Sequence, residues 1–165
     1  MYHSSLVREI EPLPASAIPL FRTRLLSTGF ASSARISVPQ GLLLSSLGYG
    51  GGARTSELSR MQVAHLLDEN GNPAENVRFY PDVTKHWVPR RVPMHPDIRR
   101  DLENFLRFHP NEQFVGFAAG RYKEKCLPQS AIDTWFRHQL RAAGLGKYSA
   151  ASFRKAFLAT KPEVA

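Results

Sequence analysis

The chain has 165 residues, of which 42% are hydrophobic and 22% are charged, a balance typical of one globular domain. Its longest apolar run is four residues, 156–159, far below the roughly 18 residues that a membrane span needs, and residues 1–5 do not begin a secretory signal. The single cysteine, Cys126, excludes an internal disulfide and a multi-cysteine zinc site, so we expect a reducing, cytoplasmic environment.

Positive charge is concentrated in the second half of the chain. The net charge is +8 and the isoelectric point is near 10.1. Residues 84–155 hold 14 basic and 6 acidic side chains, whereas the rest of the chain holds eight of each. A basic face is the electrostatic footprint of a polyanion such as nucleic acid, but an ordinary soluble domain can also be cationic. Charge alone therefore leaves both interpretations open.

Apolar residues at helical spacing predict six helices in chain order. These are expected at residues 16–26, 39–47 and 55–67, from Pro96 onward, from Ser130 to Gly144, and from Ser149 onward. Pro39 suits a first helical turn, and the glycine-rich residues 48–52 are expected to end the second helix because glycine sustains a helix poorly.

Two short extended runs, residues 76–80 and 87–94, predict a β-hairpin joined through residues 81–86. Lys85 is expected near its tip. Pro89 and Pro93 confine the second run to the edge of a sheet, because proline cannot donate a ladder hydrogen bond. The predicted fold class is α+β and mostly helical.

The glycine run has two competing interpretations. Gly48-x-Gly50-x-x-Ala53 fits the spacing of a dinucleotide-binding loop, which requires residues 42–47 to form a strand and would use Asp82 as the later acidic residue. Pro39 and the lack of a repeating strand–helix pattern argue against it. In the other interpretation, Arg54 begins the following helix and binds a phosphate with two parallel donors, unless it is a plain surface arginine.

Three short motifs follow one another along the chain. They are Gly52-Ala53-Arg54-Thr55-Ser56-Glu57-Leu58, then Lys85 with Arg90 and Val92-Pro93-Met94, and finally Ala151-Ser152-Phe153-Arg154. Over roughly residues 35–160 the sequence resembles the catalytic domain of the tyrosine recombinases, the phage and plasmid integrase family. The resemblance divides the chain into an N-terminal segment with the first helix (1–34) and an integrase-like core (35–165).

This resemblance implies recombination and integration of double-stranded DNA through a phosphotyrosine intermediate, by a homo-oligomer assembled on DNA, without metal or nucleotide cofactor. Arg54 and Arg154 match the two arginines that hold the charge on the scissile phosphate, and Lys85 matches the lysine that protonates the leaving 5′ oxygen. Three further basic side chains are predicted to contact the phosphates of DNA: Arg90, Arg91 and Lys155.

Two departures from the family pattern bear on activity. The histidine of the third motif is replaced by Ala151, and the chain ends 11 residues after Arg154, before the family's second His/Trp position and its nucleophile. No tyrosine stands at the nucleophile's position; the five present are Tyr2, Tyr49, Tyr80, Tyr122 and Tyr148. We therefore expect that this chain alone does not cleave DNA. It is either an incomplete or altered recombinase core or an inactive DNA-binding or regulatory module on the same fold.

Overall fold

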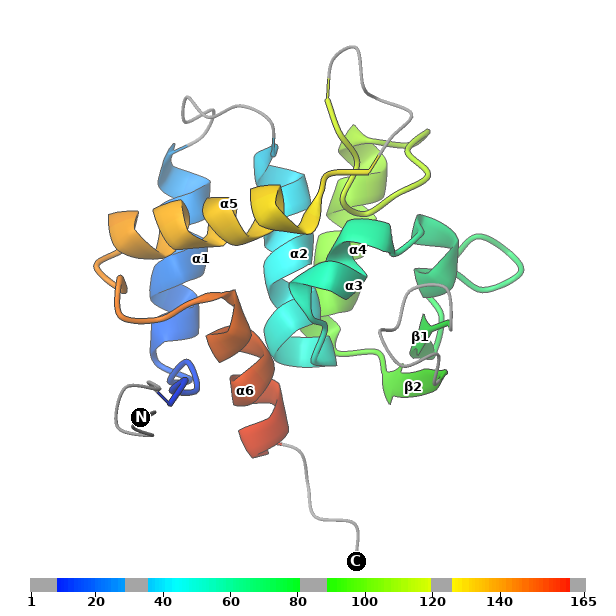
Figure 1. Cartoon of the computed structure of the whole chain (residues 1–165). Coiled ribbons are helices and arrows are strands. Elements are labelled where there is room, and N and C mark those ends of the chain that lie inside the picture. Colours follow the sequence, from blue (N-terminus) through cyan, green and yellow to red (C-terminus); the bar gives the residue numbers. More distant parts are fainter. Residues whose placement is uncertain (1–8, 29–35, 81–88, 120–125, 161–165) are drawn as a thin grey trace, which may run out of the picture.

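The computed structural model describes residues 9–28, 36–80, 89–119 and 126–160, and these residues form a mostly helical α+β domain (Figure 1). The elements are α1 (Ala17–Thr28), α2 (Val38–Gly51), α3 (Thr55–Arg60), the 3-10 helix η2 (Val63–Leu66), β1 (Asn76–Phe79), β2 (Arg90–Pro93), α4 (Pro96–Phe108), α5 (Gln129–Ala142) and α6 (Ala150–Thr160). The predicted fold class and the order of helices and hairpin are confirmed.

Helix α2 is the centre of the domain, with α1, α4 and α6 packed around it (Figure 1). Every residue from Gln40 to Gly51 is buried, which is the mark of a helix that is covered on all sides. Its start follows from local chemistry, because the Ser37 hydroxyl accepts the Gln40 N–H and Pro39 lies in the first turn.

The prediction that residues 48–52 break this helix is wrong, because the helix continues through Gly51. The glycines of this helix allow side chains of other elements to pack directly against its backbone. A Cβ atom on Gly48 would lie 2.9 Å from the Cβ atom of Phe153, and one on Gly50 would lie 2.9 Å from Cγ of His95. The helix ends at Gly52, which has a φ of 70° and donates its N–H to the Gly48 carbonyl. A helix over residues 42–47 also excludes the strand that the dinucleotide interpretation required.

The predicted helix over residues 55–67 is also shorter than expected. Helix α3 ends at Arg60, and Met61 has an extended backbone. The reason is a competing pairing with a distant segment: the Met61 carbonyl accepts the Val115 N–H at 3.0 Å, and the Val63 N–H donates to the Gln113 carbonyl at 2.8 Å. Only the 3-10 turn η2 remains of the second half of the predicted helix.

The predicted hairpin is confirmed by the strands that the structure describes. Strands β1 and β2 pair antiparallel, with Val77 opposite Val92 and Phe79 opposite Arg90. Val77, Phe79 and Val92 are buried, so one face of this two-stranded sheet packs on the core. The tip of the hairpin, residues 81–88, lies outside the described residues.

Aromatic side chains join α1, α5 and α6 on the other side of α2. The ring centroid of Phe153 in α6 lies 5.0 Å from that of Phe21 in α1 and 5.0 Å from that of Phe136 in α5. All three rings are almost completely buried. Burial of a phenylalanine side chain stabilises a fold by about 1.5–3 kcal/mol, so this cluster fixes the place of α6, which carries Arg154.

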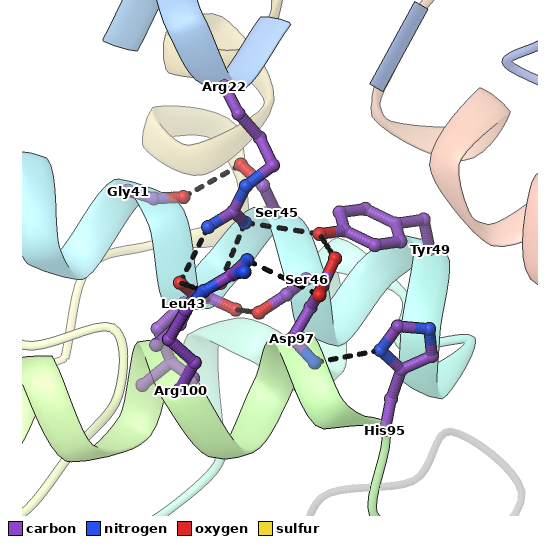
Figure 2. A network of polar contacts seen from close by, with 10 residues as sticks. Arg22, Gly41, Leu43, Ser45, Ser46, Tyr49, His95, Asp97 and Arg100 are labelled. Carbon is purple, nitrogen blue, oxygen red and sulfur yellow. Dashed lines mark hydrogen bonds and ion pairs between the residues drawn. The ribbon is translucent and has the colours of Figure 1, made fainter. Parts of the chain in front are cut away.

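A buried polar network fixes α1 against α2 and α4 (Figure 2). The guanidinium of Arg22 donates two hydrogen bonds of 2.8 Å to the carboxylate of Asp101 and one of 3.1 Å to the Tyr49 hydroxyl. That hydroxyl donates to Oδ2 of Asp97 at 2.5 Å. Burial and this hydrogen bond raise the pKa of Tyr49 above its ordinary value, so the phenol stays protonated.

Candidate functional site

The carbonyl oxygen of Gly52 joins two arginines that lie far apart in the sequence. Nε of Arg154 in α6 donates to it at 3.1 Å, and Nη2 of Arg90 in β2 donates to it at 3.3 Å. Gly52 and Arg154 are 102 positions apart, and the packing of α6 against α2 brings them together (Figure 1). Arg54 follows two residues later as the N-cap residue of α3. We call Arg54, Arg90 and Arg154 the arginine cluster.

One buried carboxylate, that of Glu57, holds this cluster. Its side chain is fully buried, and its Oε1 atom accepts the backbone N–H of Arg54 at 2.9 Å. Arg90 binds it with both terminal nitrogens, at 2.5 Å and 2.8 Å. Burial alone would raise the pKa of Glu57, but the hydrogen bonds from Arg90 and from the Arg54 N–H hold it below its ordinary value. Glu57 is therefore an ionised partner of Arg90 at neutral pH.

Arg90 makes a second contact within the protein, with the ring of Phe79. Its guanidinium carbon lies 3.8 Å from the centroid of the Phe79 ring, directly across the hairpin in β1. A cation over an aromatic face is attracted by the ring quadrupole, by about 0.5–1 kcal/mol at exposed sites and more when desolvated. Its side chain retains 32% of its exposure, so it lies at the edge of the site rather than inside the core.

The charges of the cluster do not cancel. Among the described residues, Glu57 is the carboxylate that faces three guanidiniums, and it is bound by one of them, that of Arg90, which leaves the group cationic. Burial lowers the pKa of Arg154, and the nearby charges of Arg54 and Arg90 lower it further. Both Arg54 and Arg154 are partly exposed. Partly desolvated guanidiniums of this kind attract an anion strongly, and their paired N–H donors match two oxygens of a phosphate.

The other residues expected at the site are placed as follows. Lys85 lies within residues 81–88, outside the described part of the chain. Arg91 is exposed on β2, opposite Arg78, and Lys155 is half-buried on α6, next to Arg154. Ala151 is exposed in the first turn of α6, one helical turn before Lys155. The structure thus brings together Arg54, Arg90 and Arg154, while the contacts of Arg91 and Lys155 with DNA remain predictions.

Three contributors to this site were not singled out from the sequence. Glu57 has the sequence signal of a capping carboxylate, because it lies three residues after Arg54, but the motif alone does not predict that it binds Arg90. The Gly52 carbonyl and the Phe79 ring carry no sequence signal of their own, because a backbone oxygen and a buried aromatic occur in every domain. Only the fold reveals them.

The fold that holds the arginine cluster is similar to those of known proteins. No family model matches the sequence, and no curated protein matches it. Among solved structures, the integrase from mycobacterium phage Brujita aligns over 92% of this chain with a TM-score of 0.60 at 17% identity. A lambda integrase dimer bound to a COC′ core site aligns over 92% of this chain with a TM-score of 0.62 at 12% identity.

The chain therefore has a tyrosine-recombinase-like fold, as the sequence motifs predicted. More narrowly, the likeness is to two phage integrases, and the chain spans 44% and 40% of the lengths of those structures. No helix within the described ranges is long and apolar enough to cross a membrane.

Proposed function

We propose that this chain is the DNA-binding core of a site-specific recombinase of the integrase type. In this proposal Arg54 and Arg154 bind one phosphate of double-stranded DNA. The observation that carries it is the convergence of these two partly exposed arginines beside one carboxylate and one carbonyl, on a fold shared with phage integrases. Arg91 and Lys155 are proposed to contact neighbouring phosphates, and the excess of basic residues from 84 to 155 supports a polyanionic partner.

The chemistry follows from the charge of the cluster. In the proposed reaction a tyrosine gives up its phenolic proton to solvent and its oxygen attacks the phosphorus. The bond from the phosphorus to the 5′ oxygen breaks, and Lys85 donates a proton to that leaving oxygen. Arg54 and Arg154 stabilise the charge that develops on the other phosphate oxygens. The phosphodiester bond energy is kept in the covalent link to the tyrosine, so the step needs no nucleotide cofactor.

The second candidate is a DNA-binding or regulatory module without chemistry. Ala151 favours it, because a methyl group can neither bond a phosphate oxygen nor carry a proton. The Tyr49 hydroxyl is already held between Arg22 and Asp97, so this tyrosine is not available as a nucleophile. Both candidates predict binding of duplex DNA, and only the first predicts strand cleavage in a complete recombinase.

Binding is tested by the affinity for a mixed-sequence DNA duplex, measured at several salt concentrations by fluorescence anisotropy. The logarithm of affinity should fall linearly with the logarithm of salt, with a slope of about −0.9 for each phosphate neutralised. Arg54→Met and Arg154→Met should each reduce the steepness by about one phosphate and weaken binding about tenfold, without changing which sequences are preferred.

The matched control is Arg107→Met, which removes an exposed guanidinium from the last turn of α4. This residue lies about 16 Å further along α4 than Pro96, at the end of the helix away from β2 and Arg90. We expect its loss to act only through the general charge of the chain, with an effect below about twofold. Binding that does not depend on salt would contradict the proposal.

Cleavage is tested with a nicked suicide substrate, which traps a covalent protein–DNA adduct. We expect no adduct from this chain. An adduct that maps to one of its own tyrosines would refute the statement that the chain does not cut DNA by itself.

A further inference from the structure

We propose that Arg90 is a positioning residue of the arginine cluster. In this view it neutralises Glu57 and thereby keeps Arg54 and Arg154 free for the phosphate, and it does not contact the DNA itself. The inference rests on the proposed function, and it replaces the direct DNA contact that the sequence assigned to Arg90.

The contacts of Arg90 leave it little capacity for a ligand. Both of its terminal nitrogens donate to Glu57, and one of them also donates to the Gly52 carbonyl, so three of its five N–H groups are used within the protein. Phe79 covers one face of the guanidinium. Arg54 and Arg154 have no comparable contact with a carboxylate through their side chains among the described residues.

The need for Arg90 follows from the burial of Glu57. A carboxylate with no exposed surface cannot be left without a cation, because the uncompensated charge costs several kcal/mol. Arg54 and Arg154 both lie close enough to Glu57 to interact with its charge. Without Arg90, we expect Glu57 to attract one or both of these guanidiniums, and a guanidinium held by Glu57 no longer binds the phosphate.

The Gly52 carbonyl couples Arg90 to Arg154 in a second way. A carbonyl oxygen has two lone pairs, and here it accepts one hydrogen bond from each of the two arginines. Two like charges on one oxygen repel each other, and the negative charge of Glu57 beside Arg90 offsets this repulsion. Arg90 therefore holds the Gly52 carbonyl in position for its hydrogen bond with Arg154, and the ion pair of Arg90 with Glu57 limits the positive charge beside that carbonyl.

The test is a rescue experiment that uses the duplex-binding assay on the full chain. Arg90→Met leaves Glu57 unpaired and should weaken binding at least about tenfold, with the salt slope reduced by one to two phosphates, or about 0.9–1.8 units. The double variant Glu57→Gln/Arg90→Met removes both charges, and the amide oxygen of the new glutamine side chain can still accept the Arg54 N–H. It should restore the affinity to within about threefold of the wild type, with the salt slope of the wild type.

Each alternative role of Arg90 gives a different outcome. If Arg90 contacts a phosphate, the double variant binds as weakly as Arg90→Met, and the inference is wrong. If Arg90 only stabilises the fold, affinity follows the melting temperature of each variant instead of the charge at Glu57, and the inference is also wrong. Arg90→Lys keeps a cation beside Glu57 and should retain most of the affinity, whereas Arg107→Met again serves as the matched loss of charge.

The test remains decisive if Arg90→Met does not fold. The affinity of the double variant for DNA is then compared with that of the wild type: a direct contact of Arg90 with DNA predicts an affinity about tenfold lower, and a positioning role predicts nearly the same affinity. A wild-type chain that shows no salt-dependent binding would refute the proposed function itself, which is a separate outcome from failure of the rescue.

Discussion

Gly52 stands where α2 ends and the arginine cluster begins, and its backbone serves both. Its φ of 70° is a left-handed conformation that costs a residue with a side chain about 1–2 kcal/mol. A Cβ atom there would also lie 2.5 Å from Cδ2 of Phe157 in α6. The same glycine thus terminates a helix, admits a ring and presents its carbonyl to two arginines.

At this residue we predict that Gly52→Ala lowers the free energy of unfolding by about 2–5 kcal/mol, the backbone cost plus about 1–3 kcal/mol for overpacking. Urea unfolding followed by circular dichroism measures it. Gly71→Ala is the matched control, because Gly71 has a φ of 80° and nothing within 4 Å of the added Cβ atom. It should show the backbone cost alone, and equal losses in the two variants would contradict the packing argument.

At the scale of elements, the network in Figure 2 attaches α1 to α4 through a pair that is largely withdrawn from solvent. The side chains of Arg22 and Asp101 are 14% and 3% exposed. Removing one partner of a buried ion pair costs about 3–5 kcal/mol, because the other charge is left unpaired. We therefore predict that Arg22→Met destabilises the domain by about that amount in urea unfolding.

The double variant Arg22→Met/Asp101→Asn should recover part of this loss, because it also removes the orphaned charge. As a control, Arg99→Met at an exposed position of α4 should change stability by less than about 0.5 kcal/mol. A double variant less stable than Arg22→Met would show that the penalty comes from lost packing and not from the unpaired carboxylate.

The elements also show what the sequence could predict. Four apolar residues at helical spacing, Ile98, Leu102, Phe105 and Leu106, predict the helix that begins at Pro96. The first three are fully buried in α4, and Leu106 is half-buried beside them. The ends of α2 and α3 could not be predicted in the same way, because they depend on partners far along the chain. Phe153 requires the glycines of α2, and residues 113–115 pair with the backbone after Arg60.

At the scale of the whole molecule, the site also combines features that the local sequence predicts with features that depend on distant contacts. The motif around Arg54 and the one around Arg154 could be paired from the sequence only through the family resemblance, because 102 positions separate Arg154 from Gly52. Their common anchor depends on how α6 packs on α2. The sequence predicts a DNA contact for Arg90, and it gives no sign of the buried carboxylate of Glu57 that Arg90 binds, because that contact depends on the fold.

Two carboxylates couple the stability of the whole domain to pH. Burial would raise the pKa of Glu57 and Asp97, but hydrogen bonds from Arg90 to the first and from Tyr49 to the second hold both pKa values below their ordinary 4.5 and 3.8. A carboxylate whose pKa is lower in the folded state contributes stability that is fully present above its unfolded pKa and is lost as the pH falls through the folded value.

We therefore predict that the free energy of unfolding falls in two stages as the pH is lowered. It falls slightly below about pH 6.5, because burial lowers the pKa of His109 and the unfolded chain takes up that proton first, and it falls steeply below about pH 5, where Glu57 and Asp97 take up protons on unfolding. Urea midpoints measured at successive pH values give this curve. The double variant Glu57→Gln/Arg90→Met should show a shallower fall, because position 57 no longer takes up a proton on unfolding, while Asp97 still does. If the two curves have the same steepness below pH 5, Glu57 is not an ionised partner of Arg90, and the charge balance proposed for the arginine cluster fails with it.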